Sequence, residues 1–466
     1  MISVTSQATV RPSVETKPPG LSVNLTPLDL VVPKVYAALL LLFDDPNGRF
    51  SDQVAISSSL ERALSEYPAL TAELVEENGA VPRLVFNNKG ATLVYAQGSE
   101  EDFQRMVNGQ FAPETIHPNL FPRGPFPKPG ETVLAVQITL VTIRFPQFPG
   151  SKVAVGFRRH HHVADLPAFL DFIYRWSEVH GKNSLEVQEG LISIQQKHLV
   201  RNLAKLVEVI QPAPSYVNHE YRLGTGAENT GMTRKPEPIY GKQFILDSEA
   251  LANLKEYAHL GLNDGCWVST NDAVAALFWR AVSRARELGK NGTTKLGLAV
   301  NGRERIKALA PESEGYFGNF ITGLCVSHTV DDLLTQPLGT TALMLRQAIR
   351  GHSPERIRSS IDYLLSLDPA TQLPLLRTSH TEVFGDDVAV TQWSKYPFYE
   401  AEKLHFGTGG CPFLVSPGST VGDGVIVILP AAPGRQGIEV MVGLTALPME
   451  RLVKDAELGK FTKILG

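Results

Sequence analysis

Cysteine is scarce in this chain of 466 residues, which has three, Cys266, Cys325 and Cys411, far apart from one another. Such isolated cysteines form neither a CxxC metal knuckle nor a disulfide framework, which favours a reducing compartment. Long apolar runs are also missing, and none approaches the ~20 residues that a membrane-spanning helix requires. Residues 1–20 are polar and lack the apolar core of a secretory signal. We therefore expect a cytoplasmic protein with no membrane partner.

A strong excess of charge of either sign is absent as well. The 44 lysines and arginines nearly balance the 48 aspartates and glutamates, which leaves a formal net charge of −4. Because nucleic-acid-binding proteins usually carry a basic face, this balance predicts no nucleic-acid partner. No Walker loop, and no GxGxxG after a predicted strand, offers a cradle for nucleotide phosphates. The hydrophobic share of 43% is ordinary for a folded globular protein.

The length of the chain exceeds what a single core usually supports, and this predicts two lobes. We expect an N-terminal lobe over residues 1–180 and a C-terminal lobe over residues 241–466. Residues 181–240, which contain several prolines and glycines, would form the crossover between the lobes. We expect the protein to be a monomer.

The stretch RRHHHVAD at residues 158–165 lies where the hydrophobic pattern changes. Apolar residues alternate over residues 153–157, as in a strand, and take helical spacing from Leu166 onward. The three histidines therefore occupy a strand-to-helix junction, a place where reactive groups are often presented. Elsewhere the pattern predicts a helix over residues 57–66 with a serine cap and a final helix near residues 448–461.

A histidine at such a junction suits a general base, because its ordinary pKa lies near 6.5 and it accepts protons close to neutral pH. A metal site is the competing interpretation of three consecutive histidines. On an extended backbone His160 and His162 would point one way and His161 the other, and no further Cys/His cluster completes a coordination shell. A third alternative is that all three histidines are structural. We predict no metal site.

The segment HHVAD at residues 161–165 resembles the HxxxD motif of the BAHD acyltransferases, which use coenzyme A thioesters. Other segments resemble that family in the same order along almost the whole chain. They are residues 25–29 (LTPLD), 60–74 (LERALSEYPALTAEL), 134–139 (LAVQIT), 269–280 (STNDAVAALFWR), 301–303 (NGR), 315–319 (GYFGN) and 427–443. HxxxD alone is a weak signal, whereas the ordered set is specific. The stretch WSKYPFYEAE at residues 393–402 resembles fungal members that acetylate secondary metabolites.

The resemblance implies an α/β fold, a two-domain sandwich like that of chloramphenicol acetyltransferase, with mixed sheets flanked by helices and a channel between the lobes. It implies that His161 deprotonates a hydroxyl of a small secondary metabolite, which then attacks an acyl-CoA, most simply acetyl-CoA. The acyl-CoA would be a co-substrate, with no permanently bound cofactor. Asp165 would face away from the channel and pair with Arg303. His160 and His162 have no assigned chemistry and are candidates for lining the channel.

The sequence departs from the family pattern at two places. Leu166 stands where the family has a glycine after the aspartate, which predicts a local change in the turn. The late family motif DFGWG is replaced by HFGTG at residues 405–409, which retains Gly407 and Gly409. His405 and the two glycines are candidates for lining the channel, although a partly solvated loop histidine is the simpler interpretation of His405.

Other activities remain open on the same scaffold. An amine could replace the hydroxyl as acceptor, and a CoA-independent condensation or cyclisation would also use a base at His161. A non-catalytic binding protein is the third alternative. Such a protein would be expected to have lost the base, whereas His161 is present in this chain.

Overall fold

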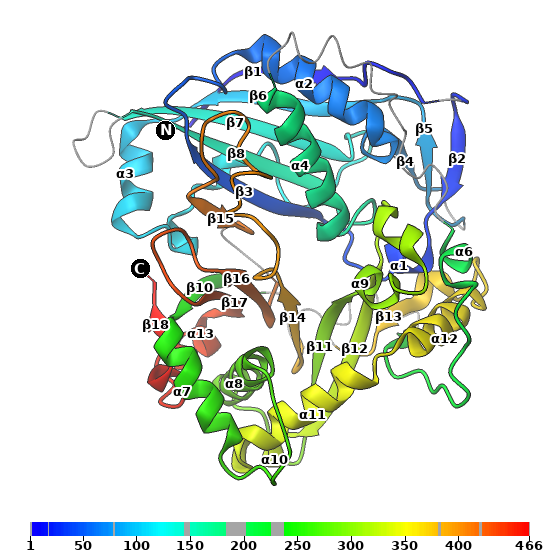
Figure 1. Cartoon of the computed structure of the whole chain (residues 1–466), viewed down its shortest axis with the longest axis vertical. Coiled ribbons are helices and arrows are strands. Elements are labelled where there is room, and N and C mark those ends of the chain that lie inside the picture. The colour runs from blue at the N-terminus through cyan, green and yellow to red at the C-terminus, as the bar shows by residue number, and fades with distance from the viewer. Residues whose placement is uncertain are drawn as a thin grey trace.

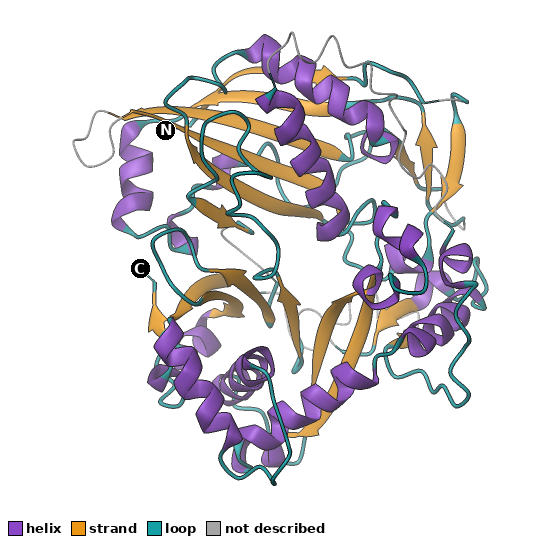
Figure 2. Cartoon of the chain, viewed as in Figure 1, coloured by secondary structure: helices purple, strands orange, loops and turns teal. Residues whose placement is uncertain are grey.

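The computed structural model shows two lobes, each built on a mixed β-sheet with helices packed against it (Figure 1, Figure 2). The described residues are 2–16, 18–77, 80–143, 150–182, 202–224, 237–380, 384–418 and 422–465. Much of the predicted crossover at residues 181–240 lies outside these ranges. The lobes correspond to two large hydrophobic clusters, one formed mainly by the first third of the chain and the other after residue 243.

The first sheet has six strands in the order β1-β6-β7-β8-β3-β15. They are β1 (Ser3–Val10), β3 (Tyr36–Asp44), β6 (Ala91–Gln97), β7 (Leu134–Ile143), β8 (Gly150–His160) and β15 (Leu414–Ser416). β6 and β7 run parallel, and the other neighbours are antiparallel. β15 comes from the range expected to belong to the C-terminal lobe, so the chain returns late to complete the N-terminal sheet.

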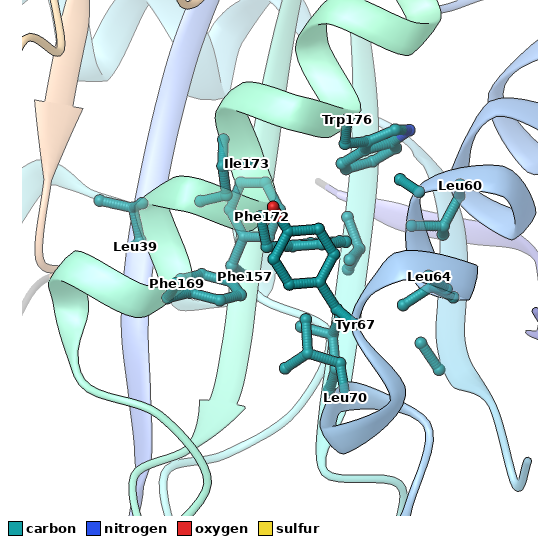
Figure 3. Packing of buried hydrophobic residues seen from close by; sticks show 14 of the residues in the cluster. Leu39, Leu60, Leu64, Tyr67, Leu70, Phe157, Phe169, Phe172, Ile173 and Trp176 are labelled. Atoms are coloured by element: carbon teal, nitrogen blue, oxygen red, sulfur yellow. The ribbon is translucent and has the colours of Figure 1, made fainter. Parts of the chain in front are cut away.

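Helices α2 (Gln53–Glu66) and α4 (Leu166–Gly181) pack against each other and cover one face of this sheet. Aromatic side chains fill the space between them (Figure 3), where Tyr67 meets Phe172 edge to face at 5.4 Å. Phe157 of β8 packs edge to face on Trp176 of α4. Each such fully buried side chain stabilises the fold by about 1.5–3 kcal/mol. This packing fixes the position of α4, and therefore the position of its first turn, which follows the histidines.

The second sheet has seven strands in the order β12-β11-β14-β16-β17-β10-β18. They are β10 (Ile239–Leu246), β11 (Thr293–Asn301), β12 (Ile321–Thr329), β14 (Val388–Gln392), β16 (Val425–Pro430), β17 (Ile438–Thr445) and β18 (Lys463–Ile464). β14 is parallel to both of its neighbours, and the remaining pairs are antiparallel. α8 (Thr270–Ala285) is almost wholly buried in the core of this lobe, and Ser269 and Asp272 close its N-terminus in a capping box.

Smaller elements complete the two lobes. The strands β2 (Leu21–Asn24), β5 (Arg83–Phe86) and β4 (Glu73–Val75) form a three-stranded sheet, and β9 (Tyr221–Leu223) pairs with β13 (Leu376–Thr378). The other helices are α1 (Pro27–Leu30), α3 (Glu100–Asn108), α6 (Leu203–Val207), α7 (Ser248–His259), α9 (Gly302–Ile306), α10 (Val330–Thr335), α11 (Leu338–Gly351), α12 (Pro354–Leu365) and α13 (Ala446–Leu452). Single 3-10 turns span Pro68–Leu70, Pro113–Thr115, Pro118–Leu120, Pro311–Gly315, Leu373–Leu375 and Leu458–Lys460.

Two helix predictions need correction. The helix expected over residues 57–66 begins at Gln53, because the Asp52 carboxylate rather than a serine caps it by accepting a hydrogen bond from the Ala55 amide. The final helix expected near residues 448–461 ends at Leu452, and a 3-10 turn at Leu458–Lys460 follows it. Among the described residues, no helix is both long enough and apolar enough to cross a bilayer.

Candidate active site

The junction between β8 and α4 presents the three histidines. β8 ends at His160, a short turn follows, and α4 begins at Leu166. Asp165 is the N-cap of α4, where its Oδ1 accepts a hydrogen bond from the Ala168 amide at 3.0 Å. Leu166 is the first helical residue and has no positive φ, so this turn does not require the glycine of the family motif.

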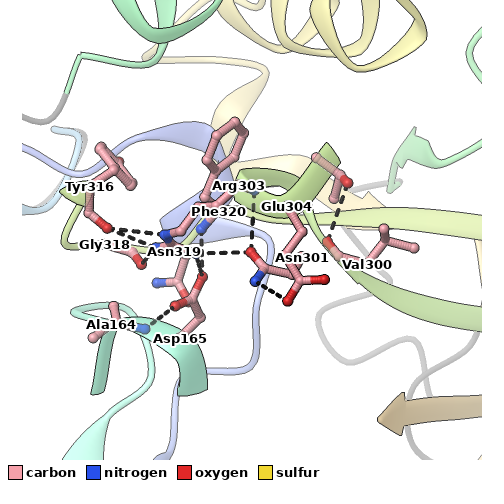
Figure 4. A network of polar contacts seen from close by, with 12 residues as sticks. Ala164, Asp165, Val300, Asn301, Arg303, Glu304, Tyr316, Gly318, Asn319 and Phe320 are labelled. Carbon is pink, nitrogen blue, oxygen red and sulfur yellow. Dashed lines mark hydrogen bonds and ion pairs between the residues drawn. The ribbon is translucent and has the colours of Figure 1, made fainter. Parts of the chain in front are cut away.

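The second oxygen of Asp165 joins this junction to the C-terminal lobe. Its Oδ2 accepts one hydrogen bond from the Arg303 guanidinium and one from the Phe320 amide, both at 2.7 Å (Figure 4). The Asp165 side chain is 1% exposed and that of Arg303 is 6% exposed. A carboxylate buried to this degree needs a charged partner and further donors to offset its desolvation. The structure supplies both.

Arg303 is fully occupied on its other edges. Its Nε and one terminal nitrogen donate to the Tyr316 carbonyl, and the same terminal nitrogen donates to the Gly318 carbonyl at 2.8 Å. The guanidinium therefore holds the loop before β12 against the start of α4 in a fixed geometry. Removal of either charge would leave the other buried without compensation.

Asn319 provides a second link that the sequence interpretation did not assign. Its side-chain nitrogen donates to the backbone carbonyl of His161 at 2.8 Å and to Asp29 Oδ1 at 2.9 Å. The other oxygen of Asp29 accepts from the amide and the hydroxyl of Thr26. Three segments that carried the family resemblance, at residues 25–29, 161–165 and 315–319, thus meet through one buried amide.

The His161 backbone is held from both sides. Its amide donates to the Val35 carbonyl of the segment before β3, and its carbonyl accepts from Asn319. The ring is partly exposed. Nδ1 is buried and has no hydrogen-bond partner, and Nε2 forms no hydrogen bond with the described residues. Burial lowers the pKa of His161 to about 4, and the nearby charge of Arg159 acts in the same direction. The imidazole is therefore neutral at pH 7 and can accept a proton.

His160 and His162 are both buried and pack together edge to face, with ring centroids 5.1 Å apart. The expectation that these two share a side agrees with this packing, although the backbone beyond His160 is a turn and not a strand. His160 also packs edge to face on Tyr36. Burial lowers the pKa of both rings, and His162 contacts the Val32 carbonyl through Nε2.

The turn at residues 405–409 lies at the other end of α4. The amides of His405 and Phe406 both donate to Ser177 Oγ at 2.9 Å. Ser177 follows Leu166 by eleven residues, which corresponds to about 16 Å along the helix. The structure therefore does not bring His405, Gly407 or Gly409 next to His161.

The substituted residues of this turn bond within it. His405 Nδ1 accepts from the Gly407 amide, and Thr408 Oγ1 donates to the His405 carbonyl. Gly407 and Gly409 have φ values of 76° and 91°, so the glycine turn is kept. Phe406 is fully buried and packs edge to face on Trp176 at 5.0 Å.

A cavity of about 410 Å³ is lined by Arg303 and by none of the three histidines. It is lined by the first turn of α4, by α9 and by the loop at residues 314–317. Within the described ranges, no group of three or more His, Cys, Asp or Glu side chains is arranged to hold a metal ion.

Residues 1–459 match the Transferase family. This is the family of the BAHD acyltransferases. The chain belongs to it, and the protein is an acyltransferase. Its two mixed sheets with flanking helices have the BAHD architecture.

Curated relatives match over nearly their full lengths. Anthranilate N-benzoyltransferase protein 1 of Dianthus caryophyllus is 27% identical, over 97% of this chain and 98% of that protein. Shikimate O-hydroxycinnamoyltransferase of Nicotiana tabacum is 26% identical, over 97% of this chain and 98% of that protein.

Solved structures share the fold of this BAHD protein. The F. graminearum TRI101 complex with coenzyme A and deoxynivalenol aligns with a TM-score of 0.74 and 18% identity, over 96% of this chain and 100% of that one. Vinorine synthase aligns with a TM-score of 0.64 and 16% identity, over 99% of each chain.

Proposed function

We propose that the protein transfers an acyl group, with acetyl as the first candidate, from an acyl-CoA to a hydroxyl of a small secondary metabolite. His161 acts as the general base. The single observation that carries this role is a neutral, partly exposed histidine on a backbone held by Val35 and Asn319. The structural neighbour TRI101, which was solved with coenzyme A, supports the choice of co-substrate.

In this mechanism Nε2 of His161 accepts the proton of the acceptor hydroxyl as the oxygen attacks the thioester carbonyl. The tetrahedral intermediate collapses, the carbon–sulfur bond breaks, and the proton on His161 passes to the departing thiolate. The products are an ester and free CoA. Asp165 touches neither substrate. It positions the turn that carries His161 through Arg303 and the Phe320 amide. A base of this kind contributes about 10²–10⁴ in rate.

Transfer to an amine is the second candidate. The curated relatives include an anthranilate N-benzoyltransferase and a putrescine hydroxycinnamoyltransferase, so relatives of this chain are named for both amine and hydroxyl acceptors. The same base would serve an amine, which loses its proton after attack. Acceptor panels should therefore contain paired alcohols and amines.

The test is the release of free thiol from acetyl-CoA, benzoyl-CoA and a hydroxycinnamoyl-CoA in the presence of such a panel. His161→Ala should lose about 10²-fold or more in kcat while it binds CoA with unchanged affinity by isothermal titration. His405→Ala, a histidine variant at the far end of α4, is the matched control. Turnover by His161→Ala at the wild-type rate would refute the base assignment.

A further inference from the structure

Arg158 is a partly buried arginine for which the proposed mechanism has no use. It lies on β8 three residues before His161, so the two Cα atoms are about 10 Å apart. Its only hydrogen bond to a described residue runs from one terminal nitrogen to the Tyr36 carbonyl at 3.1 Å. Its Nε is buried without a partner. No carboxylate of the described residues lies within ion-pairing distance of it.

Two buried arginines of this protein are paired with carboxylates, whereas Arg159, which is also buried, donates among the described residues only to the Ala164 carbonyl. Arg303 pairs with Asp165, and Arg286 pairs with Asp423 at 2.7 Å. Arg123, which also contacts Tyr36, donates to three hydroxyls and a carbonyl and lies 3.8 Å from a Glu131 carboxylate oxygen. Burial lowers the pKa of Arg158 to about 10, and no acidic neighbour opposes this effect. A guanidinium stays charged at neutral pH even so, and burying such a charge without a counter-ion is costly.

An aromatic ring and two small residues lie around the Arg158 side chain. The guanidinium carbon lies 4.7 Å over the Phe121 ring. Ala38 faces Arg158 across the β3–β8 pair, and Gly418, at φ 101°, lies next to Ala38 and Phe121. Neither Ala38 nor Gly418 has a side chain that could neutralise the charge.

Arg158 of β8 and His161, which directly follows β8, donate to two consecutive backbone carbonyls. The Arg158 guanidinium donates to the carbonyl of Tyr36, and the His161 amide donates to the carbonyl of Val35. A ligand group at Arg158 is therefore held at a fixed separation from the base.

We propose that Arg158 binds an anionic group, a carboxylate or a phosphate ester, of a co-substrate bound beside His161. This proposal rests on the proposed acyl transfer. A carboxylate of the acceptor or of the acyl group is the favoured source, because the long pantetheine arm separates the CoA phosphates from the reacting thioester. Guanidinium and carboxylate match in geometry and form paired charge-assisted hydrogen bonds.

The test measures binding, so it does not depend on turnover. Isothermal titration compares 4-hydroxybenzoate with 4-hydroxybenzamide, and CoA with 3′-dephospho-CoA, on wild type, Arg158→Gln and Arg158→Lys. The wild type should prefer the carboxylate over the amide. Arg158→Gln should lose that preference by about tenfold to a hundredfold, the usual range for a hydrogen bond to a charged group, and Arg158→Lys should keep part of it.

Two further readouts separate binding from a structural role. Arg158→Gln should melt at or above the wild-type temperature, because it removes a buried charge that has no partner. Arg123→Gln should melt lower, since it removes several hydrogen bonds, yet should keep the carboxylate preference.

The outcomes of the titrations are distinct. A loss confined to the carboxylate pair identifies the acceptor or acyl group as the source of the anion, and a loss confined to the CoA pair identifies a phosphate. Unchanged affinities in Arg158→Gln for all four ligands would overturn the proposal. Absence of thiol release from a wild type that binds the carboxylate would instead count against the proposed function.

Discussion

Two family motifs of this chain, the junction at residues 161–165 and the turn at residues 405–409, hold their positions by different means. The junction depends on buried polar groups, since Asp165 and Asn319 each satisfy partners from distant segments. The turn depends on backbone shape and on one aromatic side chain, Phe406. The junction keeps the family residues that make these bonds, whereas the turn has replaced two residues and formed new local hydrogen bonds.

The difference follows from what each contact demands. A buried carboxylate needs donors at specified points, and a missing donor costs the full desolvation of the orphaned group. A glycine turn needs only the left-handed conformation and room near the backbone. Gly407 has a φ of 76°, which is left-handed. It also leaves room for Arg49, because the Cβ of any other residue at this position would lie 2.7 Å from Arg49 Nε.

Acidification should produce the largest effect on stability. Burial lowers the pKa of His160 to about 3 and the pKa values of His180 and His352 to about 4. Below about pH 6.5 the unfolded chain binds protons at these positions and the folded chain does not, so stability falls as the pH drops toward 4. Each such histidine removes about 1.4 kcal/mol per pH unit in this window.

Urea unfolding at pH 7.5 and pH 5.5 measures this loss. His352 bonds to Thr322 of β12 and is not one of the three junction histidines, and His352→Gln should reduce the difference between the two pH values. Burial also lowers the pKa of His405, but this residue is partly exposed, so His405→Gln should reduce that difference by less than His352→Gln does. Equal midpoints at both pH values in the wild type would contradict the account.

Asp165→Ala should be the most damaging single change at the junction. It leaves the Arg303 charge buried and unpaired, which costs about 3–5 kcal/mol. Thermal or urea unfolding gives the loss. Asp165→Asn keeps an acceptor for the Phe320 amide and should lose less. An unfolding midpoint of Asp165→Ala equal to that of the wild type would show that the ion pair does not contribute to the free energy of unfolding.

Asn319→Ala should cost about 1–3 kcal/mol, because Asp29 and the His161 carbonyl lose a buried donor. It should also lower kcat/KM by about tenfold, since displacement of a catalytic group by a fraction of an ångström is costly. Steady-state kinetics at a temperature where the variant is fully folded separates the two effects. A loss of stability with unchanged kcat/KM would show that Asn319 does not position His161.

His405→Ala should have the smallest effect. It removes one acceptor from the Gly407 amide, worth about 1 kcal/mol, and leaves kcat/KM unchanged because the turn lies at the far end of α4. Gly407→Ala should be worse, since it combines a left-handed φ with a close contact to Arg49. A selective loss of activity in His405→Ala would place this turn in the site after all.

The hydrophobic pattern predicted the strand before the histidines and the helix after them, and the family resemblance implied the contact between Asp165 and Arg303. The sequence did not predict that Asn319 binds His161, because these residues lie 158 positions apart and an asparagine carries no signal of its partner. The Asp52 cap was missed because serines at residues 57–59 offered an equally good helix start. The lack of a partner for Arg158 is a property of tertiary packing, which one sequence does not encode locally.

The central claim is that burial keeps His161 neutral and ready to accept a proton. The most direct test is kcat/KM for an alcohol acceptor at pH 7.5 and pH 5.5, with folding verified by circular dichroism at both values. A base with a pKa of about 4 predicts nearly equal values of kcat/KM. A base with an ordinary pKa of about 6.5 would lose about tenfold at pH 5.5, and that result would contradict the account.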